Sequence, residues 1–324
     1  MRLEVIGQRL LTGRMCISQA ALVFARTLFA NTRKYSDGKA CWSPVEADQL
    51  KLSDVPQLAA LYQRADSELS TVEHFVSQVE AELCECLRHS TIPSDELVEA
   101  IAVCKIRGVG RSAELCFQLQ QEVGSFALLG GGGFEHLDML LCCKFAEGDE
   151  RILMQKMARD RLKSVQGGGL SGWCELGADL LADQPRRREA IKALQLALAM
   201  RTAQPSRAAD EDAARTEHEM AEMYATLMSM EKPGLMRSAP PHEVWREPES
   251  SAARAARKEA EKAAMVSAWA ESWEEVYALA EAICDRHIAE MARKQRSPDE
   301  AREAAELEMQ MGQIGLHPLI SARL

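Results

Sequence analysis

Residues 8–30 read QRLLTGRMCISQAALVFARTLFA, and this stretch decides the fold class more than any other part of the chain. Its apolar residues run almost without interruption, and they do not follow the strict alternation of a half-buried strand. The pattern predicts a long helix that is apolar almost all round, and such a helix is expected to be buried between other helices. The stretch therefore predicts a helical bundle.

The composition agrees with this prediction. Among the 324 residues, 47% are hydrophobic and only 5% are aromatic, while alanine, leucine, glutamate and arginine dominate. These residues favour helices, so the expected fold class is all-α. A formal net charge of -10 argues against a nucleic-acid-binding protein, which normally carries a basic surface. No apolar run is long enough to span a bilayer, so we expect no membrane span.

The 10 cysteines do not form paired CxxC motifs, so the sequence predicts no zinc or other metal site. The sequence has no secretory signal, and a disulfide framework is therefore not expected. Most of the cysteines are expected to be small buried hydrophobic residues.

Helix-breaking glycine and proline residues and helix caps divide the sequence into three predicted regions. Residues 1–163 form a helical bundle domain, with helices expected over 55–87, from Ser94 as N-cap to about residue 123, and over 149–163. Residues 164–252 combine helices with Gly- and Pro-rich linkers, and residues 253–324 form a C-terminal helical region. A capping box at Ser297 predicts one more helix start.

Three stretches of the first region carry possible chemistry. The first combines Gly13-Arg14 with the segment YSDGKACW, residues 35–42. Taken by itself, Lys39 in this segment has the properties of an ordinary solvated loop lysine. The second is GGGGF, residues 130–134, which is a weak phosphate-loop signal or a tight turn that needs positive φ. The third is FAEGDERIL, residues 145–153. Taken by itself, Glu147 in this segment has the properties of a solvated acid before a helix N-terminus.

In this order and spacing, the three stretches resemble the C-terminal helical domain of the acyl-CoA dehydrogenase and oxidase superfamily. The resemblance covers about residues 8–163 and implies that residues 1–163 form a four-helix bundle. The Glu-Gly-Asp sequence is closest to acyl-CoA oxidases, and residues 253–324 weakly resemble the extra C-terminal helical domain of those enzymes. It implies a flavoprotein oxidoreductase of fatty-acid β-oxidation, in which FAD oxidises a fatty acyl-CoA to a trans-2-enoyl-CoA. The resemblance also implies a homodimer formed through this domain.

The resemblance assigns a role to several residues. Glu147 matches the catalytic base, Gly148 lies where the backbone approaches the substrate thioester, and the expected FAD-binding residues are Lys39, Trp42, Gly130, Gly131 and Asp149. Lys39 stands at the family's arginine, which reaches the FAD of the neighbouring subunit, with Arg33 as a competing candidate. Ala127 replaces a family glutamine that contacts FAD, which leaves one expected polar contact missing.

The chemistry explains why a carboxylate is needed at this position. Removing a proton α to a thioester requires a carboxylate held against Cα and shielded from water, so that its pKa approaches that of the activated substrate. A backbone N–H at Gly148 is suited to stabilise the developing enolate.

Two further expectations follow from the resemblance. The family carries an N-terminal helical domain and a β-domain before this one, so the chain is expected to lack part of a flavin site. The alternative is therefore a non-catalytic helical interaction protein derived from the family. The ending Ala322-Arg323-Leu324 resembles a peroxisomal address, with a cytoplasmic or mitochondrial location as alternatives.

Overall fold

The computed structural model describes residues 2–42, 50–167, 169–202 and 251–294. Helices account for 87% of these residues, and the described parts contain no strand beyond an isolated bridge between Ala40 and Lys51. The predicted all-α fold class is confirmed. The helix and Pro-rich segment predicted within residues 203–250, the capping box at Ser297 and the C-terminal tripeptide lie outside the described residues.

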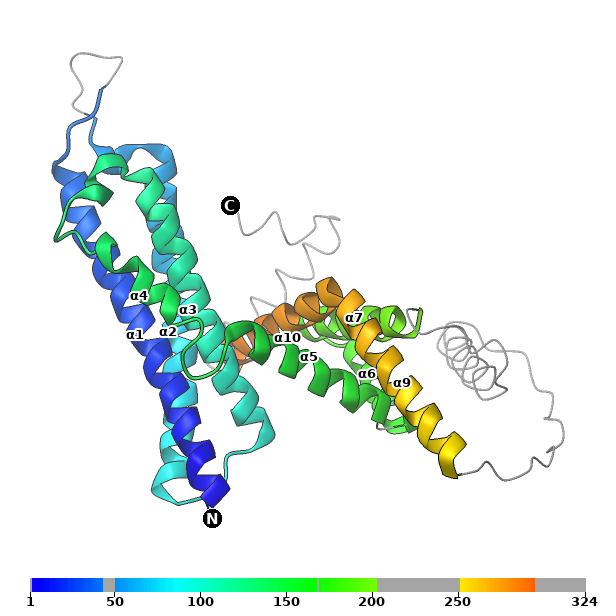
Figure 1. Ribbon diagram of the computed structural model, residues 1–324. Coiled ribbons are helices and arrows are strands. Elements are labelled where there is room, and N and C mark those ends of the chain that lie inside the picture. The colour runs from blue at the N-terminus through cyan, green and yellow to red at the C-terminus, as the bar shows by residue number, and fades with distance from the viewer. Residues whose placement is uncertain (1, 43–49, 168, 203–250, 295–324) are drawn as a thin grey trace. The chain divides into compact units, whose positions relative to one another are not determined.

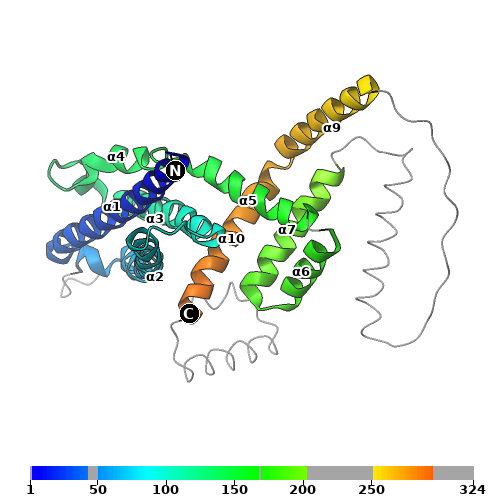
Figure 2. The ribbon, with the colours of Figure 1, turned by 90° about the horizontal axis from the view of Figure 1, so that it is seen from below.

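Three long helices form a bundle: α1 (Arg2–Gly38), α2 (Pro56–Arg88) and α3 (Asp95–Glu122). They lie side by side along most of their length, as Figures 1 and 2 show from two directions. Each sends apolar side chains into a shared core, including Leu28, Phe75 and Ile101, which are at most 2% exposed. This burial is the main favourable contribution to folding of the bundle.

The ends of these helices follow the sequence closely. Ser94 is the N-cap of α3, and its Oγ accepts a hydrogen bond from the backbone N–H of Leu97 at 3.1 Å. Pro56 occupies the first turn of α2, where the missing N–H of proline removes no helical hydrogen bond. The predicted cap at Ser94 is therefore confirmed.

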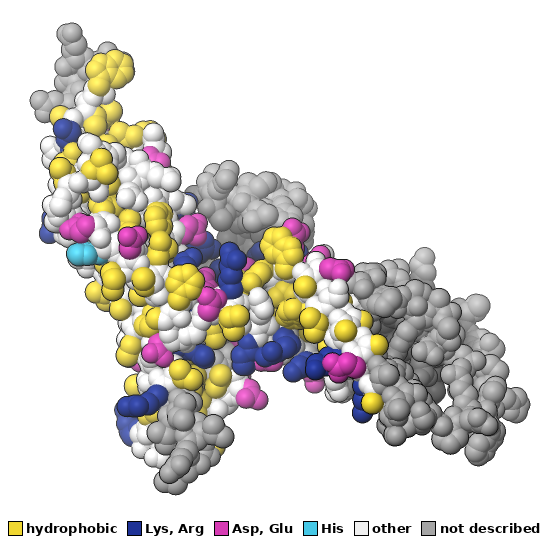
Figure 3. Space-filling view, viewed as in Figure 1, with side chains coloured by type: hydrophobic (Ala, Val, Ile, Leu, Met, Phe, Trp, Pro, Cys, Tyr) yellow, Lys and Arg dark blue, Asp and Glu magenta, His cyan; other side chains and the backbone are white. Residues whose placement is uncertain are grey.

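Helix α1 is not buried all round within the described residues, and this expectation was wrong. One face, including Met15 and Leu22, packs into the bundle, whereas Val23 is 64% exposed and Leu10 is 44% exposed. Figure 3 shows many hydrophobic side chains at the surface on the side of the molecule that carries α1 and α4. A three-helix arrangement covers only part of a helix that is apolar on every side.

Shorter elements connect α1 to α2 or follow the bundle helices. They are the 3-10 turns η1 (Leu52–Asp54), η2 (Gly124–Leu128) and η3 (Phe134–His136), and the helices α4 (Leu137–Cys142), α5 (Glu150–Gly167), α6 (Gly169–Leu181), α7 (Gln184–Thr202), α9 (Ser251–Glu271) and α10 (Trp273–Lys294). None of the described helices is long and apolar enough to cross a membrane, as the sequence predicted.

The chain divides into two compact units. Among the described residues, one unit comprises those up to Lys192 together with those from Tyr277 onward, and the other runs from Ala193 to Val276. All residues of the candidate site lie in the first unit. The predicted boundaries at residues 163 and 252 stay predictions, although α5 continues without a break through residue 163.

Candidate active site

Glu147 lies in the loop between α4 and α5, which we call the Glu147 loop (residues 143–149). A chain of turns shapes its first half, in which the N–H groups of Phe145 and Ala146 both donate to the carbonyl of Cys142 at 3.1 Å. The loop is then closed by the N–H of Glu150, which donates to the carbonyl of Lys144 at 2.9 Å. The backbone around Glu147 is therefore held in a compact conformation.

Two successive residues of this loop adopt left-handed backbone conformations. Glu147 has φ +54° and Gly148 has φ +106°. Among the described residues, Ser90 is the only other non-glycine residue with positive φ. A left-handed conformation costs a residue with a Cβ about 1–2 kcal/mol, so the surrounding contacts must stabilise Glu147 in this geometry.

The first stretch of the sequence analysis meets the third at this point. A Cβ atom placed on Gly13 of α1 would lie 2.5 Å from Cδ of Glu147, so the carboxylate packs directly on the glycine. The neighbouring Arg14 donates from Nε to the carbonyl oxygen of Glu147 at 3.1 Å. Gly13-Arg14 and Glu147 are thus in contact although about 130 residues separate them in the sequence.

Lys105 of α3 holds the same loop from the other side, and sequence reasoning missed this residue. Its side chain is fully buried, and Nζ donates to the carbonyl oxygens of Lys144 and, at 2.8 Å, of Gly148. Burial lowers the pKa of Lys105, an effect that the charges of Glu150 and Asp149 oppose. The available signal was a lysine inside the apolar segment IAVCKI, residues 101–106.

Two backbone N–H groups of the Glu147 loop are not used in its internal hydrogen bonds. Glu147 and Gly148 are both exposed, and within the described part of the chain their backbone N–H groups have no hydrogen-bond partner. Two adjacent donors therefore lie beside the carboxylate of an exposed residue, and the expected shielding of this carboxylate from water is not present within the described chain. Adjacent free N–H groups of this kind are suited to bind developing negative charge.

Asp149, predicted to contact FAD, has a structural role in this chain. Its Oδ1 accepts the backbone N–H groups of Arg151 at 2.8 Å and Ile152 at 3.2 Å. Asp149 therefore caps the start of α5 in the manner preferred for a carboxylate at a helix N-terminus.

The glycine loop (residues 130–136) uses its own carboxylate. Glu135 accepts hydrogen bonds from the N–H groups of Gly131 and Gly133, both at 2.8 Å. These glycines have φ +81° and +100°, which explains why glycine is needed there. The N–H of Gly131, expected to lie near FAD, is thus already bonded, whereas Gly130 has open space around its Cα.

The last predicted FAD residues lie beyond the end of α1. Trp42 is 83% exposed, and the backbone carbonyl of Lys39 accepts from Leu52 at 2.8 Å. The competing candidate, Arg33, pairs with Asp66 at 2.9 Å and is thus engaged with α2.

Near this end of α1, an aromatic residue of the first stretch contacts the segment that precedes the second stretch. Tyr35 stacks on Phe126, just before the glycine loop, with 3.9 Å between ring centroids. Gly13 and Gly38 are separated by about 38 Å of helix, at the helical rise of 1.5 Å per residue. The predicted residues therefore form two groups, one beside Gly13, about a third of the way along α1, and one at the C-terminal end of that helix.

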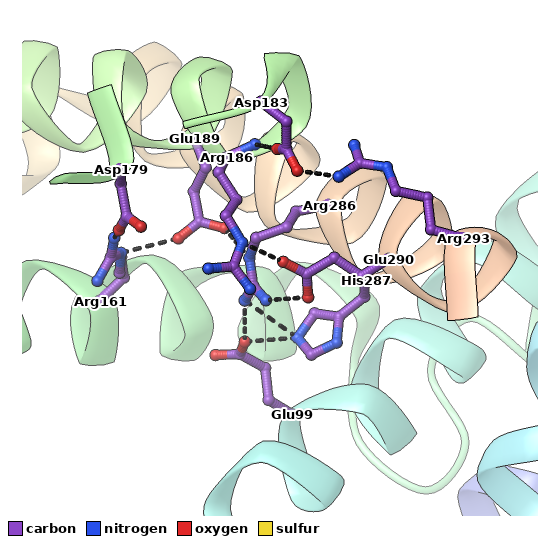
Figure 4. A network of polar contacts seen from close by, with 10 residues as sticks. All are labelled: Glu99, Arg161, Asp179, Asp183, Arg186, Glu189, Arg286, His287, Glu290 and Arg293. Atoms are coloured by element: carbon purple, nitrogen blue, oxygen red, sulfur yellow. Dashed lines mark hydrogen bonds and ion pairs between the residues drawn. The ribbon is translucent and has the colours of Figure 1, made fainter. Parts of the chain in front are cut away.

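A pocket of about 650 Å³ lies against α3 and α5 in the same unit. Arg14 lines it, and Glu147 is not among its lining residues. Much of its wall is the arginine–carboxylate network drawn in Figure 4, which comprises Glu99, Arg161, Asp179, Asp183, Arg186, Glu189, Arg286, His287, Glu290 and Arg293.

The network joins α10 to α3, α5, α6 and α7. Arg286 pairs with Glu99 at 3.1 Å, with Glu290 at 3.1 Å and with the buried Glu189, while Arg161 reaches Asp179 at 2.6 Å. The arginines are therefore largely neutralised by carboxylates. The pocket is consequently not a free anion-binding site, and the network fastens the helices of the unit together.

His287 and Glu99 form a part-buried contact of this network. Nε2 of His287 lies 2.7 Å from Oε1 of Glu99, and the imidazole is only 6% exposed. Burial alone would raise the pKa of Glu99, but the hydrogen bond to His287 and the charges of His287, Arg286 and Arg161 outweigh it and lower the pKa.

All ten cysteines are described, and most of them are not buried, which corrects the expectation from the sequence. Only Cys104, Cys116 and Cys284 are buried, and burial raises the pKa of Cys284 to about 12. Each of the ten is a free thiol. In the described residues, no group of three or more His, Cys, Asp or Glu side chains is arranged to hold a metal ion.

Comparisons with protein-family models, with curated proteins and with solved structures found no match to this chain. The candidate function is therefore argued from the residues of the site and from the resemblance of the three stretches.

Proposed function

We propose that Glu147 abstracts the α-proton of a fatty acyl-CoA thioester, as in an FAD-dependent acyl-CoA oxidase or dehydrogenase. The observation that carries the proposal is the contact of Gly13 and Arg14 with Glu147. The resemblance selected these residues from two distant parts of the sequence, and they adjoin in the fold.

The proposed step is a proton transfer. The carboxylate of Glu147 takes the proton from Cα, and the electron pair of the broken C–H bond moves to the thioester oxygen to form an enolate. The unpartnered N–H groups of Glu147 and Gly148 supply hydrogen-bond donors beside that carboxylate. Donors aimed at developing charge stabilise the transition state more than the ground state.

The residues predicted to bind FAD do not form one flavin site within a single chain. Hydrogen bonds within the chain already engage the N–H of Gly131 and the carboxylate of Asp149. Lys39 and Trp42 follow the end of α1 that lies far from Glu147. We therefore propose that the part of α1 beside Glu147 and the C-terminal end of α1 serve different active sites in a homodimer.

Peroxisomal location belongs to the same proposal. Acyl-CoA oxidases transfer electrons to oxygen and give hydrogen peroxide, and the ending Ala322-Arg323-Leu324 resembles a peroxisomal address. Fluorescent protein fused to the N-terminus, with and without the last three residues, tests this part separately.

Exchange of the α-proton tests the base without any oxidant. The full chain is incubated in D₂O with an arylacetyl-CoA, whose α-protons are acidic, and deuterium uptake is followed by mass spectrometry. The predicted result is uptake that falls roughly 100-fold in Glu147→Gln, because general-base catalysis typically contributes this much. Glu85→Gln, which changes an exposed glutamate of α2, is the matched control. Equal uptake in wild type and Glu147→Gln would exclude Glu147 as the base.

A non-catalytic interaction protein is the second candidate, and the uncovered apolar surface favours it. Val23, Met139, Phe145 and Ile152 are each between 62% and 67% exposed. Exposed apolar surface of this kind is typical of interaction sites. If the exposed apolar side of α1 mediates self-association, Val23→Glu should lower the molar mass of the full chain measured by light scattering. An unchanged mass would remove α1 from the interface.

A further inference from the structure

Lys105 is a buried cation bound to carbonyl oxygens rather than to a carboxylate. Its side chain is 0% exposed, and among the described residues it forms no ion pair within hydrogen-bond distance. A buried ammonium group is costly unless its donors are satisfied. The carbonyls of Lys144 and Gly148 provide that satisfaction, and the charges of Glu150 and Asp149 assist electrostatically.

The carbonyls that receive these hydrogen bonds surround Glu147. Lys105 binds the carbonyls of residues 144 and 148, and Arg14 binds the carbonyl of residue 147. Three carbonyls within five residues are thus held by two cations, while the N–H groups of Glu147 and Gly148 stay unbonded in the described structure. Hydrogen bonding at a carbonyl also polarises its peptide unit and strengthens the N–H on the other side.

We propose that Lys105 is a positioning residue, whose ammonium group fixes the Glu147 loop in its left-handed conformation and orients the carboxylate of Glu147 for α-proton abstraction. The part of the inference that concerns α-proton abstraction rests on the proposed function. Its structural part, that Lys105 orders residues 144–149, stands independently.

The test compares two buried cations of the same helix. Lys105→Met removes the ammonium group but keeps a side chain of similar length. Arg107→Met is the matched control, because Arg107 is also buried on α3 but faces α10, where it pairs with Asp285 at 2.6 Å. Circular dichroism first checks that both variants of the full chain fold.

Hydrogen–deuterium exchange of residues 144–149 is the first readout. We expect Lys105→Met to raise the exchange rate of this segment about tenfold, because it removes hydrogen bonds from a charged donor. Arg107→Met should leave the segment within twofold of wild type. Lys105→Arg, which retains the charge and the donors, should restore part of the protection. Unchanged protection in Lys105→Met, or equal loss in Arg107→Met, would overturn the inference.

Deuterium uptake into arylacetyl-CoA is the second readout, and it separates the two proposals. A decrease in Lys105→Met with recovery in Lys105→Arg supports the positioning role. Loss of uptake in Glu147→Gln with no change in Lys105→Met overturns the inference and leaves the proposed function standing. Absence of uptake in wild type overturns the function, while the exchange of the loop still decides whether Lys105 orders it.

A variant that does not fold needs a replacement. Lys105→Gln is shorter and uncharged but keeps two N–H donors, so it can reach at most one of the two carbonyls. We expect it to raise the exchange rate of the loop about three- to tenfold, since at most one of the two hydrogen bonds remains. Protection equal to that of wild type would again overturn the inference.

Discussion

The glycine loop and the Glu147 loop both follow α3, and both contain two residues with positive φ, yet they are stabilised in opposite ways. Glu135 bonds to Gly131 and Gly133 within its own loop. The Glu147 loop depends on Arg14 and Lys105, which come from two distant helices. The side chain that closes the glycine loop belongs to the loop itself, whereas the Glu147 loop adds to its own backbone hydrogen bonds two contacts that form only when the bundle has formed.

Gly133→Ala should give the largest effect, because the glycine loop needs a glycine at this position. The residue has φ +100°, and a Cβ there would lie 3.0 Å from Cδ1 of Leu28. We expect a loss of about 2 kcal/mol in the free energy of unfolding, measured by urea denaturation. Gly38→Ala is the control, since a Cβ at Gly38 meets nothing within 4 Å. Equal stability of both variants would contradict the conformation described for the glycine loop.

Gly13→Ala tests the long-range contact. The added Cβ would displace the side chain of Glu147, whereas alanine in a helix interior is itself favourable. We therefore expect unchanged or higher stability together with a decrease in α-deuteration of about tenfold, because misplacement of a catalytic group by about 1 Å is costly. Wild-type deuteration in this variant would mean that the carboxylate does not work from its position on α1.

The contact of His287 with Glu99 extends the comparison to α10. The pKa of Glu99 is lowered in the folded state, so its contribution to stability is present above the usual value of 4.5 and is lost as the pH falls below it. Between pH 6 and pH 3, the free energy of unfolding of wild type should fall further than that of Glu99→Gln, by an extra amount below about 1 kcal/mol. The difference is measured by urea denaturation at each pH, and identical slopes would show that Glu99 has no such role.

Glu135→Gln should give the smallest effect. The change weakens the hydrogen bonds to the N–H groups of Gly131 and Gly133 and leaves the bundle unchanged. We expect the exchange of these two amides, followed by NMR, to become severalfold faster, with no change in residues 144–149. Faster amide exchange in both loops would show that the glycine loop and the Glu147 loop are not stabilised independently.

The features that the sequence predicted correctly have local causes. Ser94 was recognised as a cap because the residues that it stabilises follow it directly. The helix predicted over residues 149–163 follows from its amphipathic pattern, and Asp149, which the resemblance assigns to FAD, caps its start in this fold. The all-α class follows from composition and periodicity, which act along the chain.

The features that the sequence did not reveal depend on the fold. Lys105 binds carbonyls 39 and 43 residues away, and no spacing rule links a lysine to backbone atoms at such separations. Glu99, Glu189 and Arg286 come from three helices, and each resembles a charge on a solvated face until the helices pack. The exposure of Val23 was missed because apolar composition does not state how many neighbours a helix has.

The site of deuterium uptake in arylpropionyl-CoA, which has both α- and β-protons, is the most direct test of Glu147 as a base. The full chain is incubated with this thioester in D₂O, and the product is examined by deuterium NMR. The proposed function predicts deuterium at Cα alone, at a rate roughly 100-fold above that of Glu147→Gln. Uptake that is equal in the two proteins, or absent from both, would contradict it.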